Sequence, residues 1–118
     1  MKEARAAVDR IVKQFSEDYK NGDSLALTAH YARDGSLGSI KGKDLISAWG
    51  KSIKNGRKSG TPYLTFTTNS LFNDGEYLVE LGIYESKDTN NNVKSRGKYL
   101  LGWNQEDGKW KIYRDIGL

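Results

Sequence analysis

The chain of 118 residues has no cysteine, a single histidine and a single proline. The lack of cysteine excludes disulfides, thiol nucleophiles and every cysteine-ligated zinc or iron–sulfur site. One histidine excludes a multi-histidine metal site within one chain, so we expect no metal and no other cofactor. Apolar runs long enough to span a membrane are also missing. The length suits one ordinary domain, and residues 1–118 are predicted to form it.

The first residues, Met1 to Arg5, open directly into an amphipathic pattern and not into a signal peptide. Together with the missing membrane span, this pattern predicts a protein that has no membrane partner and that is cytoplasmic by default. A secreted protein whose signal peptide has been removed is the alternative.

The net charge of +4 is concentrated in one segment of the chain. Residues 41–58 carry six basic side chains and one acidic side chain, a net charge of +5, which leaves −1 for the rest. Such a stripe can attract phosphates or acidic proteins, but a solvated helix face also explains it. The interleaved aromatic and basic residues of an RNA-binding platform are missing. The sequence therefore predicts no specific nucleic-acid binding, and protein binding through this segment is the weaker alternative.

The first half of the chain has the apolar spacing of helices. A first helix is predicted to end at Asn21-Gly22, because glycine readily closes a helix. Asp23 is a suitable N-cap for a second helix, which we expect to include Tyr31 and to stop at Asp34-Gly35. A third helix is expected to end at Asn55-Gly56.

After Pro62 the period of the pattern changes to the alternation of strands. Turns are expected at Asn73-Asp74-Gly75, at residues 87–92 and at Glu106-Asp107-Gly108. In the last strand, alternation predicts Trp110, Ile112, Arg114 and Ile116 on one face and Lys111, Tyr113 and Asp115 on the other. The fold class that follows is α+β, with helices packed on one face of a mostly antiparallel sheet.

Several stretches, taken in order, resemble the NTF2-like superfamily. Residues Tyr19-Lys20-Asn21-Gly22-Asp23 and Tyr31-Ala32-Arg33-Asp34 are similar to its opening of a helix, a Gly-Asp turn and a Y-A-x-D stretch. The closing Asp107-Gly108-Lys109-Trp110-Lys111-Ile112 resembles most the SnoaL-like and DUF4440 branches, which are related to ketosteroid isomerases.

This resemblance implies a cystatin-like cone, in which three N-terminal helices pack on a curved, mostly antiparallel sheet. It also implies an apolar pocket at the open end of the cone and a homodimer formed through the sheet. Members of the superfamily have many activities, so the fold alone selects none of them.

The residues that ketosteroid isomerases use are replaced in this sequence. The resemblance puts Phe15 at the position of the oxyanion-donating tyrosine and Ser39 at the position of the general base. Two other acid–base candidates remain. His30 is the only side chain that ordinarily titrates near neutral pH, and Asp115 lies on the last strand, where family members often have a polar residue in the pocket. Alternatively, His30 lies in solvent and Asp115 pairs with a surface lysine.

Aromatic residues are numerous for so small a chain. A buried tyrosine hydroxyl needs a partner, so tyrosines often surround a pocket with their polar ends inward. We expect the ligand-binding residues Tyr19, Tyr31, Trp49, Tyr99 and Tyr113, although filling a core or a dimer interface also explains such rings.

Two hypotheses about function follow. The preferred one is an NTF2-like pocket protein that binds a small, partly apolar molecule as a homodimer. The alternative is a cofactor-free enzyme of the SnoaL-like kind (an isomerase, cyclase or dehydratase), which removes a proton next to a carbonyl with Asp115 or His30.

Overall fold

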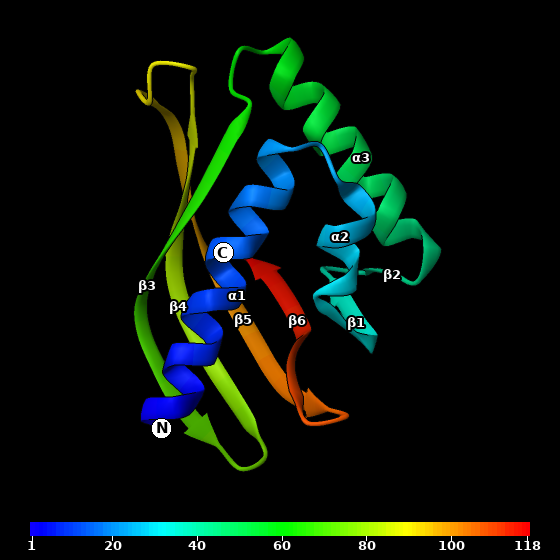
Figure 1. Ribbon diagram of the computed structural model, residues 1–118, viewed down its shortest axis with the longest axis vertical. Helices are drawn as coiled ribbons and strands as arrows, with labels where there is room; N and C mark the ends of the chain where they lie inside the picture. The colour runs from blue at the N-terminus through cyan, green and yellow to red at the C-terminus, as the bar shows by residue number, and fades with distance from the viewer.

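A curved six-stranded sheet with helices on one of its faces makes up the computed structural model, which describes all of residues 1–118 (Figure 1). The strand order is β2-β1-β6-β5-β4-β3, and only the pair of β1 and β6 is parallel. The strands are β1 (Tyr31–Leu37), β2 (Ile40–Lys41), β3 (Tyr63–Asp74), β4 (Tyr77–Lys87), β5 (Val93–Glu106) and β6 (Lys109–Gly117). The predicted α+β class with a mostly antiparallel sheet is confirmed.

The helices are α1 (Lys2–Lys20), α2 (Ser24–Ala29) and α3 (Lys43–Lys58). Only α1 lies along the sheet, next to β3 and β6, whereas α2 packs against α3 and α3 contacts the short β2 (Figure 1). The expected set of three N-terminal helices on the sheet is therefore wrong in its details. One long helix covers the sheet, α2 has only six residues, and β1 and β2 precede α3. No helix has both the length and the apolar character needed to cross a membrane.

The ends of the helices agree only partly with the predictions. The end of α1 at Asn21 and the capping role of Asp23 are confirmed, because the Asp23 carboxylate accepts a hydrogen bond from the Ala26 N–H at 3.0 Å. Tyr31 was expected in α2, but α2 ends at Ala29 and Tyr31 begins β1. The third helix continues through Gly56 to Lys58. There, glycine lets the Tyr19 hydroxyl and the Thr61 backbone come close, so it serves packing and not termination.

The strand β6 contains one extra residue, Tyr113. Along the pair of β5 and β6, Trp103 lies opposite Ile112 while Gly102 lies opposite Arg114, which leaves Tyr113 without a partner. Such a β-bulge reverses the alternation of side chains beyond it. Ile112 and Asp115 consequently face the same side, toward the helices, and the predicted faces of β6 are wrong from Arg114 onward.

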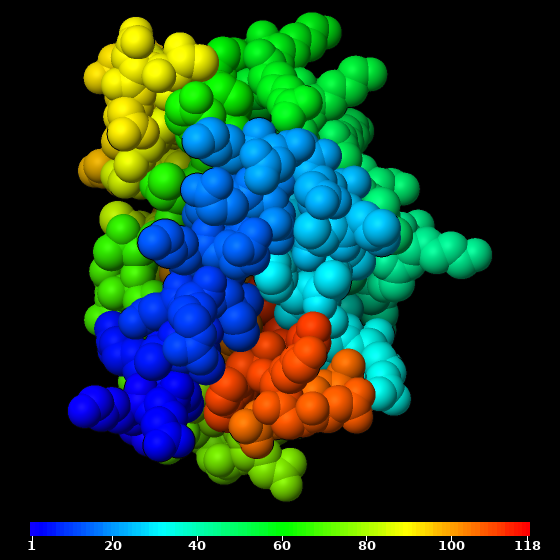
Figure 2. All heavy atoms as spheres, viewed as in Figure 1, coloured from blue at the N-terminus to red at the C-terminus, as the bar shows by residue number.

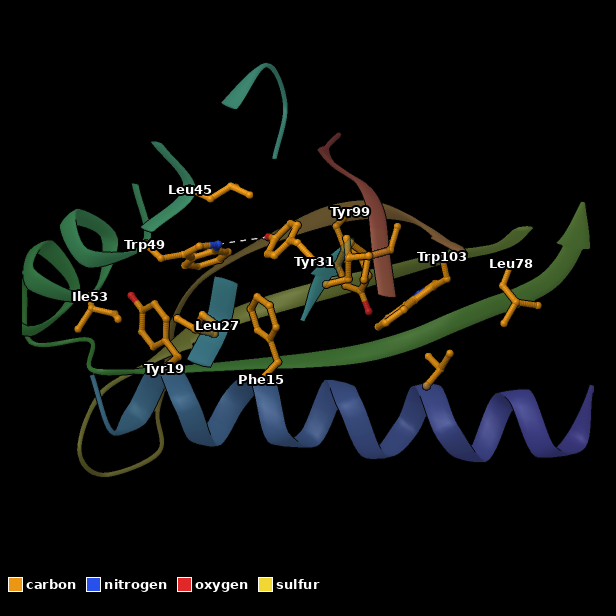
Figure 3. Packing of buried hydrophobic residues seen from close by; sticks show 13 residues of the cluster. Phe15, Tyr19, Leu27, Tyr31, Leu45, Trp49, Ile53, Leu78, Tyr99 and Trp103 are labelled. Carbon is orange, nitrogen blue, oxygen red and sulfur yellow. Dashed lines mark hydrogen bonds between the residues drawn. The ribbon is translucent and has the colours of Figure 1, made fainter. Parts of the chain in front are cut away.

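The core lies between the helices and the inner face of the sheet, the face on which α1 lies. Phe15 of α1 is at its centre, with its ring edge-on to those of Trp49 and Phe66 at centroid distances of 5.2 and 5.4 Å. Figure 3 shows Phe15 pointing from α1 toward Tyr31 and Trp49. In the space-filling view, α1 and α2 occupy the middle of this side, and C-terminal residues are visible beside them (Figure 2).

Candidate functional site

A cavity of about 310 Å³ lies between α1, α3 and the inner face of the sheet. Thirteen of its 17 lining residues are hydrophobic. They come from α1, β1, α3 and the four long strands, and include Ile11, Val12, Phe15, Tyr19, Leu37, Trp49, Leu64, Phe66, Tyr84, Tyr99, Leu101, Trp103 and Ile112. An apolar cavity of about 150 Å³ accepts a benzene molecule, so this one has room for a molecule of about two rings.

Asp115 is the only ionisable carboxyl group in the lining of the cavity. The Tyr31 hydroxyl donates a hydrogen bond to its Oδ2 at 2.6 Å. The Trp49 indole N–H donates to the Tyr31 oxygen at 3.2 Å, and Figure 3 shows this second bond. No protein donor is bonded to the other carboxyl oxygen, Oδ1. The site therefore fixes one oxygen of Asp115 through a chain of three side chains and leaves the second oxygen free.

Burial raises the pKa of Asp115 to about 6, well above its ordinary value of 3.8. The hydrogen bond from Tyr31 lowers this pKa, and the negative charge of Glu80 raises it. Burial also raises the pKa of Tyr31, and the charge of Asp115 adds to that effect. Tyr31 thus keeps its proton and donates it, while Asp115 is mostly ionised at neutral pH and can still take up a proton.

Glu80 is a second buried carboxyl group, which our reading of the sequence did not select. It is completely buried on the inner face of β4. It accepts hydrogen bonds from the Tyr99 hydroxyl at 2.5 Å, the Trp103 indole at 3.0 Å and the Thr68 hydroxyl at 2.9 Å. The sequence contains one indication of this burial, because Glu80 comes two residues after Leu78 and therefore lies on the same face of the strand. However, both faces of β4 carry apolar residues, so alternation did not tell which face is buried.

The Glu80 and Asp115 side chains lie in one row across the sheet. Leu101 of β5 is opposite Glu80 on one side and opposite Asp115 on the other. Strands are about 4.8 Å apart, which places the two acidic residues about 10 Å apart along the row. Neither residue takes part in an ion pair.

Of the predicted ligand-binding residues, Tyr19, Trp49 and Tyr99 line the cavity. The Tyr19 hydroxyl donates to the Ser52 carbonyl at 3.1 Å. Tyr31 lies behind the wall and reaches the cavity through its bond to Asp115. Three of the five predicted residues thus form the wall, and a fourth holds the carboxylate in it.

Tyr113 lies outside the cavity lining, contrary to the prediction. Its ring packs on that of Tyr77 at a centroid distance of 5.5 Å, and its hydroxyl accepts a hydrogen bond from Arg114. The bulge at Tyr113 is the physical reason, because it places this side chain and that of Asp115 on opposite faces of β6.

His30 also lies outside the cavity lining. Its Nε2 is 2.7 Å from the Asp18 carboxylate, and its ring centroid is 5.7 Å from that of Phe15. Ser39 is exposed in the turn between β1 and β2, so it provides no base to the cavity. Asp115 is therefore the only one of the sequence's acid–base candidates with a face open to the cavity.

No protein-family profile matches the sequence, and no curated protein is significantly similar to it. Many solved structures are similar in fold. One is an NTF2-like protein of unknown function from Shewanella oneidensis, with a TM-score of 0.72, 16% identity and coverage of 97% of this chain and 98% of that chain. Another is a cystatin-like protein of unknown function from Nostoc punctiforme, with a TM-score of 0.76, 12% identity and coverage of 96% and 88%.

A third similar structure is a putative calcium/calmodulin-dependent protein kinase II association domain from Xanthomonas campestris. It has a TM-score of 0.68, 16% identity and coverage of 93% of this chain and 83% of that chain. Identities this low establish the fold and leave the function open. The chain has the NTF2-like fold, as the resemblance implied.

Replacing Asp115 with Asn is expected to stabilise the protein at neutral pH. A carboxyl group whose pKa is raised on folding weakens the fold as pH rises through the window between about 4 and about 6. The rise in pKa from 3.8 to about 6 lowers the free energy of unfolding by about 3 kcal/mol at pH values above that window. Urea unfolding at a series of pH values measures the free energy of unfolding. The difference between Asp115→Asn and the wild type should increase, in favour of the variant, as pH rises through the window. Asp34→Asn, at an exposed position, is the matched control. A difference in free energy of unfolding between Asp115→Asn and the wild type that does not change with pH would contradict this account.

Proposed function

We propose that this chain of the NTF2-like fold binds a small, partly apolar molecule in its cavity. The observation that carries the proposal is the composition of the wall, in which thirteen hydrophobic residues surround a single carboxylate. Binding sites for small molecules have this character, with an apolar lining and a few polar groups that orient the ligand. The size of the cavity favours a flat molecule of about two rings.

Replacing Leu64 with Trp is expected to block the cavity. Leu64 lines it, whereas Leu25 of α2 is 66% exposed and lies outside the lining, so Leu25→Trp is the matched control. Isothermal titration with naphthalene compounds of positive, zero and negative charge should show at least one that binds to the wild type and to Leu25→Trp. The same compound should lose at least tenfold in affinity for Leu64→Trp. If no compound binds, or if Leu64→Trp binds equally well, the proposal is wrong.

A homodimer is the second part of the proposal, and the outer face of the sheet supports it. We call outer face the side opposite to the helices, which carries Val79, Leu81 and Ile83 of β4 and Leu100 of β5. Around these half-buried residues, Phe72 and Ile116 are 47% and 41% exposed. No element of the chain covers this face (Figure 1). A contiguous apolar surface of this kind is typical of a protein interface, and a self-complementary one gives a two-fold dimer.

Replacing Leu81 with Glu should convert the dimer into a monomer, because two buried carboxylates would then meet at the centre of the interface. Sedimentation equilibrium at micromolar concentrations measures the molecular mass directly. The control is Leu25→Glu, which places the same charge on an exposed apolar side chain of α2 and should leave the mass unchanged. A wild-type protein that sediments as a monomer at all these concentrations would refute the dimer.

A second candidate function is a cofactor-free enzyme that uses Asp115 as its base. The pKa of about 6 favours this function, because a general base acts best when its pKa lies near the working pH. The free oxygen Oδ1 would take a proton from a carbon next to a ketone, which leaves an enolate and a protonated Asp115. Return of a proton to that carbon restores both the ketone and the carboxylate.

Exchange of the α-hydrogens of tetralone, a two-ring ketone, with deuterium from heavy water tests this second function. Proton NMR should show exchange that is faster with the wild type than in buffer and that is lost with Asp115→Asn, while Leu25→Trp retains it. Equal exchange rates with the wild type and with Asp115→Asn would exclude Asp115 as the base.

A further inference from the structure

The charges around the cavity are of one sign. Asp115 lies in the wall and Glu80 lies behind it, and no lysine, arginine or histidine lines the cavity. All three hydrogen-bond donors to Glu80 are neutral, as is the single donor to Asp115. A buried carboxylate without a cationic partner is costly to a fold. The site therefore lacks one positive charge, and a ligand can supply it.

Most aromatic donors around Asp115 are already used within the protein. Five N–H and O–H donors on the aromatic side chains are already bonded to acceptors of the protein itself, namely those of Tyr19, Tyr31, Trp49, Tyr99 and Trp103. The free oxygen of Asp115 accepts and does not donate when ionised. The hydroxyls of Tyr84 and Ser86 are neutral donors that also line the cavity. A ligand that brings its own donor therefore matches the one charged group of the wall, the Asp115 carboxylate.

The aromatic rings favour the same charge. Phe15, Phe66 and Tyr99 form a continuous series of edge-to-face contacts on the cavity wall, with centroid distances of 5.4 and 5.8 Å. The face of an aromatic ring attracts a cation, and the attraction is stronger where water is excluded. Aromatic rings that surround a cation are a common arrangement for binding organic ammonium groups.

We propose that the ligand is an organic cation, in which a protonated amine on a flat body of about two rings lies against Asp115. This inference rests on the proposed binding function and specifies the chemical class of the ligand. The amine donates to Oδ1 of Asp115, and the apolar body occupies the space between α1 and the sheet. Tyr31 and Trp49 act as positioning residues, because their hydrogen bonds fix the orientation of the carboxylate.

The affinity for such a cation depends on the charge of Asp115. The titratable groups that face this carboxylate are Tyr31 of β1, Tyr99 of β5 and Glu80 of β4, and both tyrosines keep their protons because burial raises their pKa values. Protonation of Asp115, whose pKa is about 6, removes the charge that pairs with the amine. Binding of the cation is therefore expected to weaken as pH falls through about 6, while binding of an uncharged analogue is not.

Three naphthalene derivatives of similar shape test the inference by isothermal titration. They are naphthalenemethylamine, which is a cation at neutral pH, the uncharged naphthalenemethanol, and the anion naphthoate. The amine should bind the wild type at least tenfold more tightly than the alcohol, and naphthoate should not bind. In Asp115→Asn the amine should fall to the affinity of the alcohol, with the affinity of the alcohol unchanged.

The pH dependence of the wild type gives a test that needs no variant. The affinity of the amine should fall about tenfold between pH about 7 and pH about 5, and that of the alcohol should stay constant.

The variant Tyr31→Phe keeps the carboxylate of Asp115, so it should also keep the preference for the amine over the alcohol. Alcohol or naphthoate binding as tightly as the amine would overturn the inference and leave the binding function intact. Binding of none of the three would overturn both.

Discussion

One extra residue in β6 determines which side chains face the cavity. Because Tyr113 has no partner on β5, Ile112 and Asp115 both face the helices although they are three positions apart. The Asp115 carboxylate thereby comes within 2.6 Å of the hydroxyl of Tyr31, the first residue of β1. Without the bulge, the regular alternation of the strand would place either the apolar Ile112 or the carboxylate on the outer face. The candidate site thus depends on a feature of the backbone.

Local signals predicted much of the fold, because they act over a few residues. Glycine and asparagine at the end of α1, the Asp23 cap and the turn at Asp107-Gly108 are found where the sequence predicts them. Tyr31 was misplaced because its strand pairs with residues about 80 positions later, and no local pattern contains that pairing. The faces of β6 were misjudged because a bulge is set by the packing of two strands and not by the alternation of one.

The site was predictable only in part, because it too depends on contacts between residues that are far apart in the sequence. An aromatic wall follows from composition, and Tyr19, Trp49 and Tyr99 are in it. The burial of Glu80 depends on which face of β4 meets the helices, and that choice is made by the whole sheet. The hydrogen-bonded chain from Trp49 to Asp115 joins α3, β1 and β6, three elements whose association could not be inferred from spacing. Both carboxyl groups accept hydrogen bonds from neutral donors alone, and this lack of a cationic partner connects the fold to the proposed class of ligand.

The central claim is that Asp115 is a desolvated carboxylate, unpaired with any cation, that faces the cavity. Its titration, followed by the chemical shift of the side-chain carboxyl carbon in NMR, tests the claim most directly. The account predicts a midpoint near 6, and a further rise in Tyr31→Phe, because the Tyr31 hydrogen bond lowers this pKa. A midpoint at the ordinary value near 3.8, unchanged in Tyr31→Phe, would show that Asp115 is solvated and would contradict the account.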